Sequence, residues 1–264
     1  MTLRFCSFSS GSSGNCYLVK TDKTALLVDA GISGKKIWNG IEKTGTSIQD
    51  LKGVLITHEH SDHTKGVRIL AKKEKGLNFF ANKKTWSQLK EKGPSEQCQI
   101  FKTGDSFLIG DIQVKTFSVS HDAADPVGFS FSKGEKQVCI VTDTGCICED
   151  LLNEMRFADL LVLEANHDID MLKIGKYPWF LKQRVLGDQG HLSNESAAKT
   201  LVRLLKEEKR KRQVLLAHLS RENNFPQMAF QTVKNILEEE DYYIGKDIGL
   251  NLLLRDQLSL VYDV

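Results

Sequence analysis

The stretch Leu55-Ile56-Thr57-His58-Glu59-His60-Ser61-Asp62-His63 decides the fold of this 264-residue chain. Together with Val54 it begins as an apolar run, which has the length of one buried strand. Side chains alternate at a strand end, so His58 and His60 should point the same way. Imidazole nitrogens and carboxylate oxygens are ligands of divalent transition metals. The stretch therefore predicts a metal site rather than a polar turn. Its four ligand-type residues are too many for one metal that keeps an open position.

The His-x-His-x-Asp-His pattern that begins at His58 resembles the metal-binding motif of the metallo-β-lactamase superfamily of metallo-hydrolases. This resemblance implies further ligands at the ends of later strands, with the carboxylate of Asp143 bridging two metals. It also implies that Asp29 supports the metal loop without binding metal. The ligands implied in this way are His58, His60, Asp62, His63, His121, Asp143 and His218.

The same resemblance implies two divalent metal ions per chain. Zinc is the default metal for such ligands, and manganese is the alternative because the site contains carboxylates. We expect Asp62 to serve in catalysis as well as in metal binding. The two ligand groups are His58, His60 and His121 for one metal, and Asp62, His63 and His218 for the other.

Strands and helices alternate along the chain, which predicts an α/β protein. The superfamily resemblance sharpens this to a four-layer αβ/βα sandwich with two mixed sheets, formed by a single domain over residues 1–264. The expected strands are 2–8, 16–20, 25–28, 54–56, 77–81, a hairpin within 106–118, 127–132, 137–142, 160–163, 214–217, and a closing pair at 250–254 and 258–262. The expected helices are 35–43, 67–73, 83–92, one that opens at Ser193 or Asn194, and 226–239.

The composition is that of an ordinary globular protein. The formal net charge is +2, from 36 basic and 34 acidic residues, so overall charge does not identify a partner. We expect a cytoplasmic protein with no membrane association, because no apolar run resembles a signal peptide or a membrane span. The six cysteines include no CxxC pair and favour reduced thiols. Cys146-Ile147-Cys148 is a possible metal pair, although a loop is the simpler interpretation.

Glu164 and His191 are candidate catalytic residues. Glu164 follows a strand and His191 precedes a helix, as in the motifs of transfer-RNA-processing endonucleases that they resemble. That resemblance implies that His191 acts on the leaving group and that Glu164 holds it. A carboxylate stabilises imidazolium, which keeps a proton available near neutral pH. The alternative for His191 is an ordinary loop histidine, while His167 either supports the metal ligands or is structural.

The chain as a whole resembles the bacterial YycJ/WalJ family of metallo-hydrolases. The matching stretches are 10–16, 57–63, 164–168 and 190–194. This resemblance implies an exonuclease of double-stranded DNA, a part in DNA mismatch repair, and nucleic acid as the partner. Two alternatives remain open. One is a hydrolase of small thioesters or lactones, and the other is a non-catalytic regulatory module of a cell-wall two-component system.

Several segments could contact a nucleic acid. The loop that contains Ser12, Ser13 and Asn15 is rich in glycine and serine and could expose backbone amides to a phosphate. A flexible hairpin turn explains it equally well. The basic segments 72–75, 83–84 and 206–212 could guide DNA, but each is also typical of a solvated helix face.

Overall fold

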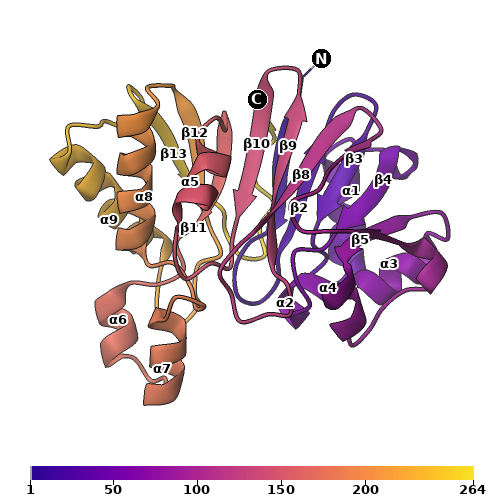
Figure 1. Ribbon diagram of the computed structural model, residues 1–264, viewed down its shortest axis with the longest axis horizontal. Helices are drawn as coiled ribbons and strands as arrows, with labels where there is room; N and C mark the ends of the chain where they lie inside the picture. The colour runs from indigo at the N-terminus through magenta and orange to yellow at the C-terminus, as the bar shows by residue number, and fades with distance from the viewer. Residues whose placement is uncertain (1) are drawn as a thin grey trace.

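Two seven-stranded sheets pack face to face in the computed structural model, which describes residues 2–264, and helices cover their outer faces (Figure 1). The first sheet has the strand order β14-β1-β2-β3-β4-β5-β6. Its strands are β1 (Arg4–Ser9), β2 (Cys16–Lys20), β3 (Ala25–Val28), β4 (Leu51–Leu55), β5 (Asn78–Asn82), β6 (Cys98–Phe101) and β14 (Tyr262–Asp263). The pairs from β14 to β3 are antiparallel, and those from β3 to β6 are parallel.

The second sheet has the order β13-β12-β11-β10-β9-β8-β7 and the same mixture of directions. Its strands are β7 (Ser106–Ile109), β8 (Ile112–Ser118), β9 (Val127–Lys133), β10 (Lys136–Val141), β11 (Leu160–Glu164), β12 (Arg212–Ala217) and β13 (Ile248–Leu252). The pairs from β7 to β10 are antiparallel, and those from β10 to β13 are parallel. The prediction of an α/β fold with two mixed sheets is confirmed.

Four of the α-helices described in residues 2–264 begin at a residue whose side chain caps the helix. Ser33 accepts a hydrogen bond from Lys36 N, and Ser193 accepts one from Ser196 N, as the sequence predicted for the helix after His191. The helices are α1 (Gly34–Lys43), α2 (Ser61–Thr64), α3 (Val67–Lys73), α4 (Lys83–Gln88), α5 (Glu149–Met155), α6 (Ile169–Ile174), α7 (Trp179–Leu186), α8 (Asn194–Glu207) and α9 (Pro226–Glu239), with short 3-10 turns η1 (Ile48–Asp50) and η2 (Ser95–Gln97).

Three apolar clusters separate the four layers. The central cluster lies between the sheets and includes Phe5, Tyr17, Phe129 and Leu215. A second cluster joins α5, α8 and α9 to the second sheet, and a third joins α1 and α3 to the first. Strand β11 is buried along its whole length because helices and the opposite sheet cover both its faces. This layering leaves the strand ends at one edge as the place where polar side chains can gather.

Two local predictions were wrong. The segments 250–254 and 258–262 do not form a strand pair, because β13 pairs with β12 while β14 pairs with β1 in the other sheet. The helix expected over 83–92 ends at Gln88, since Leu89 has a non-helical backbone conformation and buries its side chain. Among residues 2–264, no helix has the length and apolar character needed to cross a membrane.

Candidate metal centre

Ligand-type side chains converge at the edge of the sandwich where the strands of both sheets end. Asp29 follows β3, and the segment from His58 to His63 follows β4. Glu164 is the last residue of β11. His121, Asp143 and His218 come shortly after β8, β10 and β12. The carboxyl ends of parallel strands meet at one edge of a sheet, which explains why residues far apart in sequence lie together.

Three of these residues have left-handed backbone conformations. The φ angles of Asp29, Asp143 and His218 are 60°, 57° and 55°. Such conformations are unfavourable for residues other than glycine and are found at functional sites when the surrounding structure enforces them. Each of the three turns its chain sharply at a strand end and aims its side chain at the common cluster.

The first group of donors is His58, His60 and His121, whose ligand atoms lie within 4.8 Å of one another. The Nδ1 atom of His121 donates to Gly190 O at 3.0 Å, so its Nε2 is free to bind a cation. The Nδ1 atom of His58 lies 3.0 Å from the hydroxyl of Thr57, and its Nε2 faces His60 Nδ1 at 3.1 Å. One of these nitrogens can donate to the other, or both lone pairs can bind a shared cation.

The second group, Asp62, His63 and His218, meets the same distance criterion. His63 Nδ1 donates to Asp29 Oδ2 at 2.6 Å, and Thr57 donates to the same carboxylate. The Nε2 atoms of His63 and His218 both lie 3.5 Å from Asp62 Oδ2. Asp29 therefore orients His63, as expected of a residue that supports ligands without binding metal.

Asp143 lies between the two groups. Its Oδ2 is 3.3 Å from His63 Nε2, while its Oδ1 is 3.8 Å from His121 Nε2. The Oδ1 atom is also 3.3 Å from His218 Nδ1. The carboxylate of Asp143 thus lies close to histidines of both ligand groups, as a bridging ligand requires.

The cluster fits divalent cations on its own chemistry. Asp29, Asp143 and Glu164 are all buried, and burial of carboxylates without compensating charge is costly. Asp143 Oδ2 and His218 Nε2 are buried without a hydrogen-bond partner. Two cations would neutralise the carboxylates and satisfy these orphaned atoms. Cys146 and Cys148 belong to none of the donor groups formed by residues 2–264.

Glu164 holds two histidines at once. Its Oε1 accepts hydrogen bonds from His191 Nδ1 and His218 Nδ1, both at 2.8 Å. Its Oε2 accepts from the backbone amides of Thr144 at 2.9 Å and Leu192 at 3.2 Å. The sequence predicted the pair with His191 but not the second contact. Glu164 therefore links a histidine of the second donor group to the candidate catalytic histidine.

The histidines of the site fall into two sets, one with lowered and one with raised pKa values. Burial, together with neighbouring imidazoles, lowers the pKa values of His58 and His121. Burial also opposes charge on His218, but the carboxylates of Asp143, Asp62 and Glu164 raise its pKa to about 10. The pKa of His191 is raised in the same way, since the Glu164 carboxylate outweighs the effect of burial. The carboxylates thus attract positive charge to one side of the cluster.

The remaining predicted site residues differ in their surroundings. Ser12 and Ser13 are exposed on the loop between β1 and β2. Asn15 is fully buried, with Oδ1 accepting from Gly11 N and Nδ2 3.1 Å from His63 Nε2. Direct contact between Asn15 and substrate would require the loop to open, so Asn15 supports the metal loop instead. His167 is buried and neither ring nitrogen has a hydrogen-bond partner, and burial lowers its pKa to about 4.

Sequence reasoning missed several supporting residues. Thr57 binds Asp29 and His58 together, and its place directly before the first histidine could have indicated this role. Gly31 lets the chain approach the metal loop, because a Cβ atom there would lie 1.6 Å from Asp62 O. The backbone carbonyl of Gly190 orients His121. The type of residue at position 190 could not have predicted this contact, because it involves only a backbone atom of Gly190.

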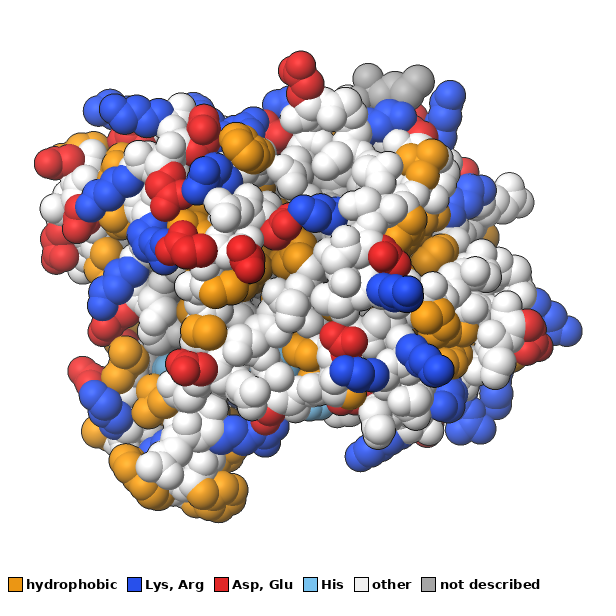
Figure 2. All heavy atoms as spheres, viewed as in Figure 1, with side chains coloured by type: hydrophobic (Ala, Val, Ile, Leu, Met, Phe, Trp, Pro, Cys, Tyr) orange, Lys and Arg blue, Asp and Glu red, His pale blue; other side chains and the backbone are white. Residues whose placement is uncertain are grey.

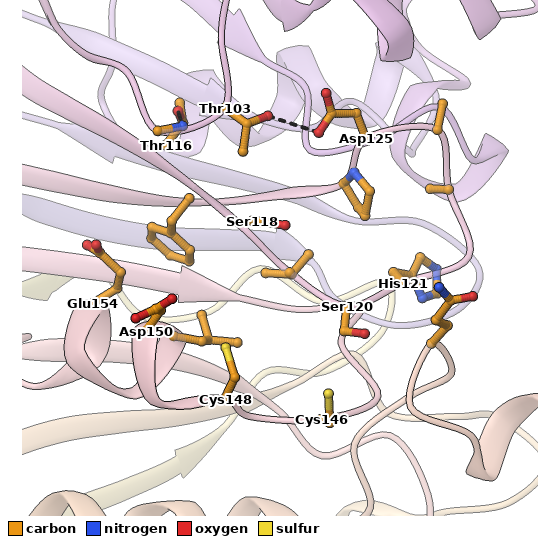
Figure 3. Close-up of a pocket in the computed structure, with 18 of the residues that line it drawn as sticks. Thr103, Thr116, Ser118, Ser120, His121, Asp125, Cys146, Cys148, Asp150 and Glu154 are labelled. Carbon is orange, nitrogen blue, oxygen red and sulfur yellow. Dashed lines mark hydrogen bonds between the residues drawn. The ribbon is translucent and has the colours of Figure 1, made fainter.

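Two hollows open beside the cluster. The larger, of about 880 Å³, runs from His121 along β8 towards α5 (Figure 3). Its polar lining includes Cys146, Cys148, Asp150 and Glu154, as the close-up shows. The smaller, of about 170 Å³, is lined by His191 together with Ser12, Asn166, Tyr177 and Arg184 among others. The cluster is therefore reachable from both sides.

The fold and the donor cluster define a metallo-hydrolase of the αβ/βα sandwich class. The profile described as "Beta-lactamase superfamily domain" matches residues 24–219, and the chain belongs to this metallo-β-lactamase superfamily. It is 41% identical to exodeoxyribonuclease YycJ of Bacillus anthracis, covering 93% of each chain. It is 42% identical to exodeoxyribonuclease WalJ of Streptococcus pneumoniae serotype 2, covering 92% of this chain and 91% of that one.

A solved structure shares the fold at lower identity. The metallo-beta-lactamase fold protein YhfI from Bacillus subtilis superposes with a TM-score of 0.71 over 100% of both chains at 15% identity. The predicted superfamily, the YycJ/WalJ relationship and the fold are thereby confirmed. Divalent metal ions follow from this fold and from the donor groups.

Proposed function

We propose that this chain is a metal-dependent exodeoxyribonuclease. The observation that carries the proposal is the Glu164–His191 pair, placed beside the donor cluster with His191 lining a hollow. Phosphodiester hydrolysis needs stabilisation of charge on phosphate and a proton for the departing alkoxide. The site offers residues for both needs. The names of the two bacterial relatives, at 41% and 42% identity, direct the proposal towards DNA.

We assign the two ions to the two donor groups, with Asp143 between them. When bound, divalent cations supply Lewis acidity towards phosphate and lower the pKa of water to about 7. Zinc is the first choice because histidine nitrogens predominate, and manganese is the alternative because carboxylates contribute. Asp29 fixes the Nδ1 proton of His63, and Gly190 O fixes that of His121, so both rings present Nε2 to the site.

The chain's own groups then handle the proton. Nδ1 of His191 is held by Glu164 Oε1, which leaves Nε2 to donate a proton to the departing oxygen. His191 is 21% exposed, so that it can reach a ligand while its partner stays buried. The Asp62 carboxylate, between two histidines, would orient the attacking water through a hydrogen bond. We also propose that the protein acts in DNA repair in the cytoplasm. Its residues 1–264 would form a single domain.

The test uses purified protein loaded with Mn²⁺ or Zn²⁺ and end-labelled nucleic acids of one sequence. We expect stepwise shortening of duplex DNA and no cut in covalently closed circular DNA, because an exonuclease needs an end. Cleavage of single-stranded DNA and of RNA is compared with that of duplex DNA to find the preferred nucleic acid. An Asp143→Asn preparation, purified identically, controls for contaminating nucleases. Absence of DNA cleavage by metal-loaded protein, with turnover of a thioester or lactone, would replace the proposal with the small-molecule hydrolase. Absence of any turnover would favour the regulatory module.

A further inference from the structure

Helices α6 and α7 form a projection beside the donor cluster, which we call the arm (residues 169–186). In Figure 1 the two helices extend below the second sheet, beyond the ends of its strands. Only Leu172 and Val185 among the arm's large aliphatic side chains are buried. The arm therefore adds little to the core.

The end of the arm exposes large hydrophobic side chains. Ile174 is 85% exposed, Trp179 is 67% exposed and Phe180 is 72% exposed. Figure 2 shows hydrophobic side chains gathered at this corner of the molecule, below the rest of the surface. Exposure of large apolar side chains to water is unfavourable. A group of exposed aromatic side chains on a projection therefore indicates a surface that a partner covers.

The arm is fixed relative to His191. At its start, Asp168 N donates to Asn223 O at 2.9 Å, and at its end His191 N donates to Val185 O at 3.0 Å. Gly190 makes this junction tight, since a Cβ atom there would lie 2.3 Å from the carbonyl oxygens of Arg184 and Val185. A ligand held by the arm is therefore held at a defined position relative to the cluster.

The smaller hollow connects the arm to the cluster. Tyr177, Leu181 and Arg184 from the arm line it together with His191 and Ser12. Its volume of about 170 Å³ is below the roughly 300 Å³ at which pockets for whole small molecules begin. It can admit a phosphate but not a nucleoside. The bases of a strand whose phosphate lies there must rest outside the hollow, over the arm that lines one side of it.

Charge favours this side of the cluster for a polyanion. Within residues 169–186 the basic residues are Lys173, Lys176, Lys182 and Arg184, and the only acidic one is Asp170. Arg184 is paired with Asp122 in the lining of the smaller hollow, so the excess of positive charge comes from the three lysines. The larger hollow is the opposite case. Its lining contains Asp125, Asp150 and Glu154, and its one lysine, Lys115, is paired with Glu154. A phosphodiester backbone is attracted to the arm and repelled by the larger hollow.

We propose that the arm is the DNA-binding surface of this protein and that Trp179 and Phe180 stack on unpaired bases next to the strand end being hydrolysed. This inference rests on the proposed nuclease function and specifies how its substrate is held. Aromatic rings stack on every base, so the contact would hold a frayed or single-stranded end without reading its sequence. Lys173 and Lys176 would contact phosphates of the same strand.

The test compares Trp179→Ala/Phe180→Ala with Phe157→Ala. Phe157 is also exposed, but it lies before the start of β11, at the opposite end of that strand from Glu164. Binding is measured by fluorescence anisotropy with labelled DNA that carries a single-stranded end, at fixed salt, in an Asp143→Asn background that prevents cleavage. Turnover is measured in the native background on the same DNA and on bis(p-nitrophenyl) phosphate, which lacks the neighbouring bases that Trp179 and Phe180 would stack on.

We expect the double variant to bind DNA roughly 10–100-fold more weakly, since one base stack is worth roughly 5–150-fold in affinity. Its KM on DNA should rise while its rate on bis(p-nitrophenyl) phosphate stays unchanged. Trp179→Phe should bind close to the parent, because a ring face is retained, and so should Phe157→Ala. Circular dichroism checks that the variants are folded.

Three results would overturn the inference. Parental binding and KM in the double variant, in a protein that does cleave DNA, would remove the arm from substrate binding and leave the nuclease proposal intact. Failure of the unmutated protein both to bind and to cleave DNA would remove both proposals together. If sedimentation shows a dimer that the double variant dissociates, with DNA binding unaffected, the aromatic rings serve contact between two copies of the chain.

Discussion

His191 and His218 donate to the same oxygen of Glu164, each at 2.8 Å. The candidate proton donor and a histidine of the second donor group therefore share one acceptor. The second oxygen of Glu164 is also fully used, by the amides of Thr144 and Leu192. A buried carboxylate with four donors has no room for a group that itself donates hydrogen bonds.

Glu164→Gln should therefore damage metal binding as well as catalysis. The glutamine amide must turn its NH₂ either towards the two imidazole donors or towards the two backbone donors, and both orientations leave donors facing each other. We expect metal affinity to fall roughly 10–100-fold, as is usual when the partner of a ligating histidine is lost. Calorimetric titration of metal into metal-stripped protein measures this. Glu154→Gln, which removes a surface partner of Lys115, should leave the affinity unchanged; equal affinities in both variants would contradict the shared role.

Asp29→Ala should affect the two donor groups unequally. Asp29 contacts His63 directly but reaches the first group only through Thr57, which lies next to His58. We expect the second metal to be lost first, at roughly 10–100-fold lower affinity, with the first largely retained. Asp143→Ala should instead weaken both metals, because its two oxygens face both groups. Metal content is measured after dialysis against increasing concentrations of chelator, which shows whether the two metals are lost one after the other or together. Simultaneous loss of both metals in Asp29→Ala would contradict the prediction that Asp29 mainly supports the second group.

The sequence predicted the positions of the donors because each follows an apolar strand in a fold whose strand ends meet at one edge. His121, Asp143 and His218 could be placed in this way with the superfamily resemblance as a guide. The double role of Glu164 could not, because it depends on strand register. Glu164 pairs with Ala217 across β11 and β12, which brings the next residue, His218, beside the glutamate. A shift of one residue would place that imidazole on the other face.

The arm also escaped prediction, for a different reason. Its helices have six and eight residues and bury little, so they lack the apolar periodicity that marks a helix packed on a core. Gly175 and Pro178 lie between α6 and α7 and are residue types typical of loops. Contacts to backbone atoms also cannot be predicted from residue types, as the hydrogen bond from His121 Nδ1 to Gly190 O illustrates. Periodicity therefore predicted most of the elements that pack on the core, although not the short helix α5, and it did not predict the arm.

Gly31→Ala should disrupt the metal loop through sterics alone. The added Cβ would lie 1.6 Å from Asp62 O and 2.7 Å from Asn15 N, so the loop must move. Overpacking of this kind costs roughly 1–3 kcal/mol, and the shift would displace Asp62 and His63 from the second donor group. We expect a lower melting temperature and weaker metal binding. Gly76→Ala is the matched control, because nothing lies within 4 Å of the Cβ it would add; similar stability of the two variants would argue against the tight approach.

The last prediction concerns leaving-group protonation by His191. A sugar alkoxide is a strong base that needs a proton as it departs, whereas nitrophenolate is stable as an anion. His191→Ala should therefore lose roughly 10²–10⁴ in rate on DNA, the usual range for general acid–base catalysis, and little on bis(p-nitrophenyl) phosphate. Because His191 shares Glu164 with His218, metal content must be measured alongside, and rates compared at saturating metal. His218→Ala is the contrasting variant: it removes a candidate ligand and should lower both rates together. Equal losses of His191→Ala on both substrates, with full metal content, would show that His191 acts on bound phosphate or metal rather than on the departing oxygen.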